Sequence, residues 1–193
     1  YDLEELKKIK HVCDAHNLGL HLDGARLMNA IVAKNENPKD YGEIFDTISI
    51  CFSKGLGTPL GTVLVGKNKF MQNAIRVRKV LGGGMRQVGY VAAAGLYALE
   101  NNIERLADDH QKASEIAACL DQQEYVRSSE QTETNIVIFY LNDNYSEEKF
   151  IADLLKENIK ISNMGQGKLR IVTHLDYTYD MHMRFLNFLR SYK

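Results

Sequence analysis

The sequence is poor in proline and cysteine, and it contains no long apolar run and no block of like charges. No apolar run approaches the ~18 residues that a membrane-spanning helix needs, so the sequence does not predict a membrane span. The formal net charge is −1, and neither nucleic acid nor a membrane surface is indicated as a partner. The three cysteines form no CxxC pair. Free thiols in a reducing, cytoplasmic compartment explain them better than disulfides or zinc.

The composition is that of an ordinary globular protein, with 45% hydrophobic and 25% charged residues among 193. The chain starts at Tyr1 rather than at a methionine, and no signal or transit pattern follows. Residues 3–13 instead carry apolar side chains three and four apart, which predicts an amphipathic helix. Because this helix would begin without a cap and with no strand before it, we expect the chain to be the C-terminal fragment of a longer protein.

Short apolar runs alternate with helical periodicity in the first part of the chain, which favours an α/β layered fold. The strands are predicted at residues 18–22, 46–52 and 61–65. Helices are predicted at residues 26–34, 91–99 and 103–120, with another beginning near 67 and ending at the glycines of 82–84. Residues 35–39, which contain Pro38, are expected to form a loop.

The composition changes at residues 125–134, which are polar and are expected to connect two domains. Strands follow at 135–141 and 169–172, and helices at 146–157 and 179–192, so the last part reads as a small α+β unit. The predicted domains are therefore residues 1–124 and residues 125–193.

Two residues near the ends of predicted strands could carry cofactor chemistry. Lys54 follows the apolar run 48–52 and is flanked by small residues; there, desolvation would favour the neutral amine that attacks an aldehyde. Asp23 follows an earlier strand and could keep the pyridine nitrogen of pyridoxal phosphate (PLP) protonated. The simpler readings are a surface lysine for Lys54 and a helix N-cap for Asp23. The pair together favours PLP chemistry.

Four arginine and lysine residues are candidates for binding anions. Arg26 could bind an anionic group or serve as a structural ion-pair partner. Lys79 and Arg86 flank the glycine-rich loop 82–84, although such a loop is more often a flexible turn and a basic run a solvated helix face. Arg170 interrupts an apolar strand and needs either an anionic ligand or an acidic neighbour. No histidine spacing suggests a metal site.

Four segments of the chain, in order and at compatible spacing, closely resemble the L-threonine aldolases, which are PLP enzymes of the aspartate-aminotransferase fold (fold type I). The similarity spans almost the whole chain. The segments are HLDGAR (21–26), SICFSKGLG (49–57), LGGGMRQ (81–87) and RIVTHLD (170–176).

The resemblance implies a PLP-dependent transferase fold, with residues 1–124 as the C-terminal part of the PLP-binding large domain and 125–193 as the small C-terminal domain. It implies that Lys54 forms the Schiff base with PLP and that Asp23 pairs with the pyridinium nitrogen. Arg26 would lie near the ring oxygen or the substrate carboxylate. The family's large domain begins well before Tyr1, and its cofactor-stacking histidine and phosphate-binding turn have no counterpart here.

The resemblance also implies cleavage of threonine or allo-threonine to glycine and acetaldehyde. Arg170 would hold the substrate carboxylate, while Lys79 and Arg86 would reach the active site from the adjacent subunit of a homotetramer built from dimers. Two other hypotheses remain open. One is another fold-type-I PLP enzyme acting on amino acids, and the other is an inactive fragment that lacks the N-terminal half of the active site.

Overall fold

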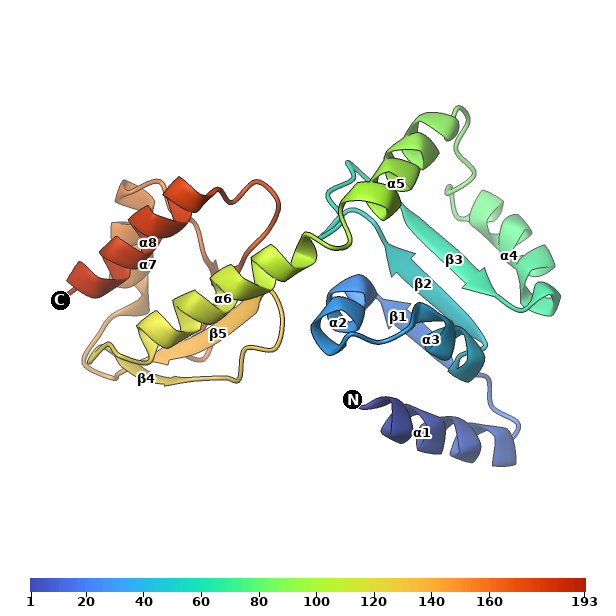
Figure 1. Cartoon of the computed structure of the whole chain (residues 1–193), viewed down its shortest axis with the longest axis horizontal. Helices are drawn as coiled ribbons and strands as arrows, with labels where there is room; N and C mark the ends of the chain where they lie inside the picture. The colour runs from blue at the N-terminus through green and yellow to red at the C-terminus, as the bar shows by residue number, and fades with distance from the viewer. The chain divides into compact units, whose positions relative to one another are not determined.

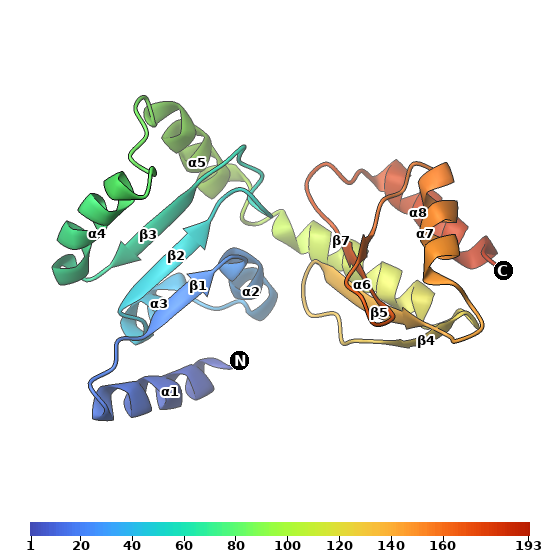
Figure 2. The ribbon, with the colours of Figure 1, turned by 180° about the vertical axis from the view of Figure 1, so that it is seen from behind.

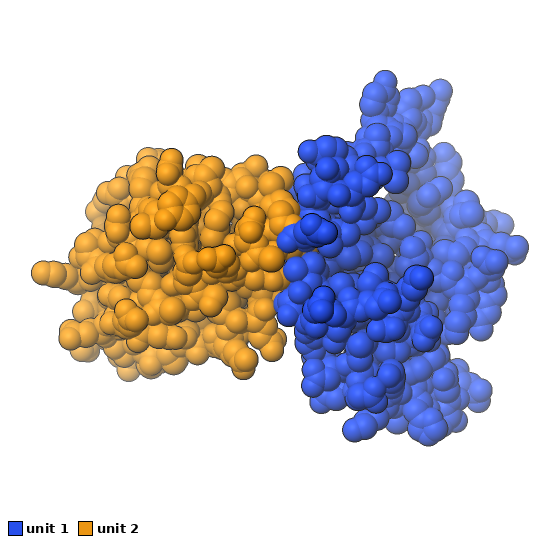
Figure 3. Space-filling view, in the orientation of Figure 1, with its two compact units in different colours: residues 1–104 blue, residues 105–193 orange.

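The structure, a computed structural model, describes residues 1–193 and divides the chain into two units, residues 1–104 and 105–193 (Figure 3). The division lies before helix α6 (Leu106–Leu120), not after it at 124/125. This helix belongs to the second unit because its Ala113, Ile116 and Leu120 lie in that unit's core. The assignment of the two parts to a large and a small domain of a longer protein stays a prediction. None of the helices combines the length and the apolar composition of a membrane span.

A three-stranded sheet, in the order β1-β2-β3, organises the first unit (Figures 1 and 2). Strand β1 runs parallel to β2, and β3 runs antiparallel to it. The carboxyl ends of β1 and β2 therefore meet at one edge of the sheet, where α/β folds bind ligands. The elements of this unit are α1 (Leu3–Ala15), β1 (His21–Gly24), α2 (Leu27–Lys34), α3 (Pro38–Ile44), β2 (Thr47–Cys51), β3 (Thr62–Gly66), α4 (Asn68–Val80) and α5 (Gly89–Asn101).

Two predictions about where and how helices of this unit begin are wrong. The first helix does have a cap, because the Glu5 carboxylate accepts a hydrogen bond from the backbone N–H of Asp2 (2.9 Å). The segment 35–39 is not all loop, because α3 begins at Pro38. The Asn37 side chain accepts a hydrogen bond from the backbone N–H of Lys39 (3.0 Å). An N-cap asparagine followed by proline is a helix-start signal that the sequence contains.

Asp46, just before β2, connects several segments of the first unit. Its carboxylate accepts hydrogen bonds from the backbone N–H of Leu20 (3.0 Å), from Lys67 (2.9 Å) and from Lys10 (3.0 Å). These donors lie in or beside α1, β1 and β3. They hold the pKa of the Asp46 carboxyl well below its usual range, and the side chain is only 11% exposed.

We expect Asp46 to make the first unit acid-sensitive. The pKa of Asp46 is lower in the folded chain than the value of about 3.9 in the unfolded one. The stability that this carboxylate contributes is therefore present above about pH 4 and is lost as the pH falls below it. Asp46→Asn should lower the free energy of unfolding at pH 7 by about 1–3 kcal/mol and flatten its decline in acid, measured by urea titration. Asp143→Asn, which removes an exposed ion pair with Arg127, is the control and should change little.

The second unit is a four-stranded antiparallel sheet, in the order β4-β5-β7-β6, with its helices packed on one face. Residues 125–134 were expected to be a connector, but 126–129 form strand β4, which pairs with β5. Besides α6, the elements are β4 (Val126–Ser129), β5 (Ile136–Leu141), α7 (Glu147–Lys156), β6 (Ser162–Asn163), β7 (Lys168–Val172) and α8 (Tyr179–Ser191).

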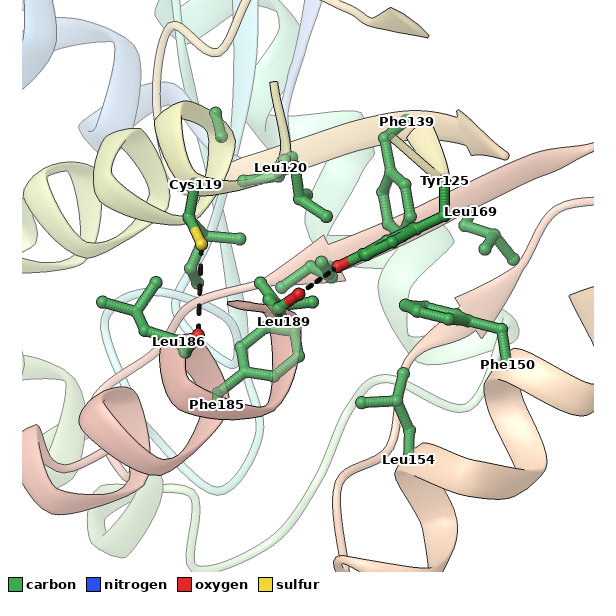
Figure 4. Packing of buried hydrophobic residues seen from close by; sticks show 14 of the residues in the cluster. Cys119, Leu120, Tyr125, Phe139, Phe150, Leu154, Leu169, Phe185, Leu186 and Leu189 are labelled. Carbon is green, nitrogen blue, oxygen red and sulfur yellow. Dashed lines mark hydrogen bonds between the residues drawn. The ribbon is translucent and has the colours of Figure 1, made fainter. Parts of the chain in front are cut away.

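Alternate residues of β5 and β7 are buried under the helices of the second unit. Phe139 from β5 and Leu169 from β7 lie in one cluster with Phe150 of α7 and Leu189 of α8 (Figure 4). Tyr125 joins this cluster, and its hydroxyl donates to the Leu189 carbonyl (2.8 Å). Because side chains alternate along a strand, the intervening residues of β5 and β7 lie on the opposite face of the sheet.

Candidate active site

Lys54 lies in a tight loop just beyond the carboxyl end of β2. The backbone N–H of Gly57 donates to the Lys54 carbonyl (2.9 Å), and that of Thr58 donates to the Phe52 carbonyl (3.1 Å). Gly57 has φ +75°, a conformation that glycine adopts readily. Leu56 is only 2% exposed, so its side chain anchors the loop to the unit. The loop therefore has a defined path on both sides of Lys54.

The Lys54 side chain is exposed, not buried as the sequence had suggested. Ile48 and Phe52 of the preceding run are buried, but Lys54 stands two residues past Phe52, outside the strand. In the loop, Leu56 and Thr58 are buried instead, at 2% and 7% exposed. In this chain the Lys54 amine is consequently not desolvated. It also makes no side-chain hydrogen bond or ion pair, so it remains available to a ligand.

Asp23 lies near the end of β1, paired in register with Ser49 of β2. It does not cap the following helix, because α2 begins at Leu27 and its N-cap position is Arg26. The Asp23 carboxylate is exposed and makes no hydrogen bond or ion pair. Since β1 and β2 are parallel, Asp23 and Lys54 lie at the same edge of the sheet. The N-cap interpretation of Asp23 is therefore excluded.

The close approach of β1 and β2 at this edge requires glycine next to Asp23. A Cβ atom on Gly24 would lie 2.4 Å from the Ser49 carbonyl oxygen, which is too short for any side chain. Arg26 follows two residues later and is half-buried at the N-cap position of α2. The segment 21–26 thus places the Asp23 carboxylate in β1 and the Arg26 guanidinium group two residues beyond the end of this strand.

A partly buried thiol lies close to Lys54. The Cys51 sulfur is 3.4 Å from the Ser53 hydroxyl oxygen. Burial by itself would raise the pKa of the Cys51 thiol, but hydrogen bonds with Ser53 and the positive charge of Lys54 together bring this pKa below its ordinary value. The positive charge of Lys54 thus acts on the thiol at the end of β2.

Lys79 and Arg86 are exposed and make no side-chain hydrogen bond or ion pair within the chain. Lys79 is in the last turn of α4. The glycine-rich loop folds back against this helix, with the Gly83 N–H donating to the Arg78 carbonyl (2.8 Å). A Cβ atom on Gly84 would lie 2.6 Å from Lys79 Cδ. The glycine-rich loop thus packs closely against the last turn of α4.

Arg170 lies in the middle of β7, opposite Ile138 of β5 and Ser162 of β6. Its neighbours Leu169 and Ile171 are in the core, so the Arg170 side chain leaves the sheet on the other face. No acidic residue forms an ion pair with it, and its Nε is buried without a hydrogen-bond partner. The acidic-neighbour interpretation is therefore excluded within this chain. A buried, unsatisfied guanidinium nitrogen fits an anionic ligand.

One residue that contacts the Lys54 loop was not identified as a site residue from the sequence, because no motif or spacing pointed to it. The Asn102 side chain, just after α5, donates from Nδ2 to the Leu56 carbonyl oxygen (2.8 Å). Forty-six positions separate the two residues, so only the tertiary structure brings them together.

The side chains at the two sites have the chemistry that PLP and an amino acid require. An uncommitted amine can take the aldehyde of PLP, and an uncommitted carboxylate at the same sheet edge can pair with its ring nitrogen. In the second unit, the unsatisfied Arg170 nitrogen can take a carboxylate. The residues present therefore fit this cofactor.

Residues 1–144 match the model of the beta-eliminating lyase family. The chain belongs to this family. It is 41% identical over 176 residues to the low specificity L-threonine aldolase of Escherichia coli K12, covering 90% of this chain and 50% of that protein. Against low-specificity L-threonine aldolase 1 of Arabidopsis thaliana the identity is 37% over 184 residues, 93% of this chain and 51% of that protein. The chain thus spans about half the length of the curated relatives it matches.

Solved structures confirm the predicted fold class, the fold-type-I fold of PLP enzymes. A putative L-allo-threonine aldolase from Listeria monocytogenes superposes with a TM-score of 0.80 at 23% identity, covering 97% of this chain and 54% of that one. A histidinol-phosphate aminotransferase from Clostridium acetobutylicum also matches, with a TM-score of 0.70 at 14% identity, 98% of this chain and 58% of that one. The fold is therefore shared by enzymes with different reactions. Beta-eliminating lyases and threonine aldolases depend on PLP.

Proposed function

We propose that the protein is a PLP-dependent aldehyde-lyase that cleaves threonine or allo-threonine to glycine and acetaldehyde. The observation that carries this proposal is the placement of uncommitted Lys54 and Asp23 at one sheet edge, in a chain 41% identical to a low specificity L-threonine aldolase. When bound, PLP supplies an electron sink for the carbon–carbon bond cleavage.

In this proposal the first unit binds the cofactor. Lys54 holds PLP covalently through its amine, and Asp23 keeps the pyridine nitrogen protonated by placing a negative charge beside it. Arg26 binds the ring oxygen or the substrate carboxylate.

Arg170 binds the substrate carboxylate through charge-assisted hydrogen bonds. The support is its unsatisfied Nε on the helix-free face of the second sheet. Two parallel hydrogen bonds from a planar guanidinium fix the direction of a carboxylate as well as its position. Fixing the carboxylate in this way orients the substrate for cleavage of its Cα–Cβ bond.

We also propose that the protein is a cytoplasmic homotetramer built from dimers, with Lys79 and Arg86 reaching the substrate site of the adjacent subunit. Fifteen of the 24 exposed large apolar side chains lie between Leu60 and Leu99. Residues 47–99 contain seven Lys and Arg and no Asp or Glu. An apolar, positively charged surface of this extent supports burial in an assembly. The three free cysteines fit a reducing compartment.

The alternative, another fold-type-I enzyme such as an aminotransferase, is favoured only by the shared fold. An assay with L-threonine and L-allo-threonine in the presence of PLP separates the two. Release of equal amounts of acetaldehyde and glycine without an added keto acid supports the lyase. Turnover that requires a keto acid would contradict the lyase proposal. Retained PLP binding without any turnover would favour an inactive fragment.

Arg170→Ala should raise KM for threonine by roughly 10- to 100-fold, because a hydrogen bond to a charged group contributes about 1.5–3 kcal/mol. PLP affinity, followed by visible absorbance, should change less than about twofold, since this guanidinium binds substrate and not cofactor. Arg127→Ala is the matched control, because it removes an exposed arginine from β4 of the same sheet. Weakened PLP binding with an unchanged KM would show that Arg170 does not hold the carboxylate.

A further inference from the structure

We propose that Asn102 is a positioning residue for Lys54. The role rests on the proposed function, in which Lys54 carries the cofactor. Asn102 is the residue at the C-cap of α5, and it donates from Nδ2 to the Leu56 carbonyl oxygen at 2.8 Å. Leu56 is two residues beyond Lys54, in the loop that sets the direction of the lysine side chain. Two further side-chain hydrogen bonds of this segment are local: the Ser53 hydroxyl oxygen lies 3.4 Å from the Cys51 sulfur, and Thr58 Oγ1 donates to the Leu60 carbonyl (3.1 Å).

The remaining contacts of the Lys54 loop leave the Leu56 peptide dependent on Asn102. Within the loop, the Gly57 N–H donates a hydrogen bond to the Lys54 carbonyl, and the Thr58 N–H donates one to the Phe52 carbonyl. The Leu56 carbonyl has no backbone partner in these turns. Because Leu56 is 2% exposed, a peptide carbonyl here needs a hydrogen bond within the protein. Asn102 supplies it.

The packing of helix α5 fixes the position of Asn102 at its C-terminal end. Its Gly95 lies against the Phe52 ring, with 3.8 Å between the ring and the Cβ position of the glycine, and its Ala98 is 1% exposed. Phe52 immediately precedes the loop, so α5 packs on one end of it while Asn102 binds its middle. A lysine side chain has four rotatable bonds, and its amine reaches one point reliably only if its backbone is held. The packing and the hydrogen bond together hold that backbone.

Loss of the Asn102 amide should therefore impair cofactor capture more than folding. A misplacement of about 1 Å at a reacting group can cost on the order of 100-fold in rate. We expect Asn102→Ala to slow formation of the Lys54–PLP adduct by about 10-fold. Asn102→Asp should slow it further, because a carboxylate oxygen would face the Leu56 carbonyl oxygen. Asn102→Gln keeps the donor and should recover part of the rate.

Asn101 provides a matched control at the same helix end. Its Nδ2 donates to the Tyr97 carbonyl (2.8 Å) inside α5, and it does not touch the Lys54 loop. The experiment mixes wild type and each variant with PLP and traps the adduct with borohydride at a series of times. The fraction modified at Lys54 is then measured by mass spectrometry, alongside Tm. Asn101→Ala should trap PLP at the wild-type rate, whereas Asn102→Ala should be slower at a Tm similar to that of Asn101→Ala.

Equal trapping rates in Asn102→Ala and Asn101→Ala would overturn the positioning role while leaving the proposed function in place. Failure of the wild type to trap PLP on Lys54 would overturn both, and it is seen before any variant is compared. If Asn102→Ala melts below the assay temperature, Asn102→Asp and Asn102→Gln decide the question. Equal rates in those two variants would then contradict the role of the amide donor.

Discussion

Lys54→Ala is expected to abolish covalent capture of PLP and to lower threonine cleavage by more than about 10⁴-fold, as the loss of a covalent catalyst does. The alanine has no amine to react with the cofactor aldehyde, and no other lysine lies in the β2–β3 loop. Lys54→Arg should be equally inactive, because a guanidinium keeps the charge but stays protonated at any usable pH. The measurements are visible absorbance with PLP and mass spectrometry after borohydride reduction.

Lys69→Ala is the control for Lys54→Ala, since Lys69 lies in the same stretch without acidic residues but on α4, beside the Phe70 ring. It should retain both the absorbance band and the activity. A specific absorbance band that persists in Lys54→Ala, with the label on another single lysine, would contradict the assignment. In that case the uncommitted amine at the sheet edge would not be the cofactor's attachment point.

Phe150→Ala is expected to destabilise the second unit by about 3–5 kcal/mol, the usual cost of removing a buried aromatic ring. Phe150 is 0% exposed, and its ring centroid lies 5.7 Å from that of Tyr125 (Figure 4). The Tyr192 ring centroid lies 4.9 Å from it. Truncation would leave a cavity that α7 and the sheet cannot close without moving the neighbouring rings. Because a whole domain is stable by only about 5–15 kcal/mol, such a loss approaches unfolding.

Urea titration followed by far-UV circular dichroism measures the effect of Phe150→Ala. Phe70→Ala removes the same side chain from α4, where it is 37% exposed, and should cost less than about 1 kcal/mol. A loss in Phe150→Ala as small as that in Phe70→Ala, below about 1 kcal/mol, would mean that the cluster around Phe150 does not stabilise the second unit. The comparison does not depend on PLP, so it tests the packing separately from the proposed function.

Much of the fold could be predicted from local patterns. The strands β2, β3, β5 and β7 and the helices α2, α7 and α8 lie within a few residues of their predicted positions, since apolar periodicity and caps act over short distances. Strand β4 was missed because Val126–Ser129 is polar, and its strand conformation depends on pairing with β5. Helix α3 was missed although Asn37 and Pro38 signal its start.

The candidate site was predictable only in part. The positions of Lys54 and Asp23 after β2 and β1 follow from residue order, because parallel strands bring their carboxyl ends to one edge. The exposure of Lys54 did not follow, since it depends on which side chain of the loop is anchored, and the structure buries Leu56 instead. That Arg170 Nε lacks a partner follows only from the tertiary structure, because a sequence cannot exclude an acidic neighbour across the strands.

The sequence by itself determined the family resemblance, the element types and the identities of the candidate site residues, because motifs and periodicity are local along the chain. Only the tertiary structure decided that Asp23 is not a helix cap, that Asp46 joins several segments and that Asn102 binds the Lys54 loop. Each of these depends on groups up to 46 positions apart approaching within hydrogen-bond distance, or on the exact residue where a helix begins. Such approaches are decided by packing, and one sequence alone does not encode them in any local pattern.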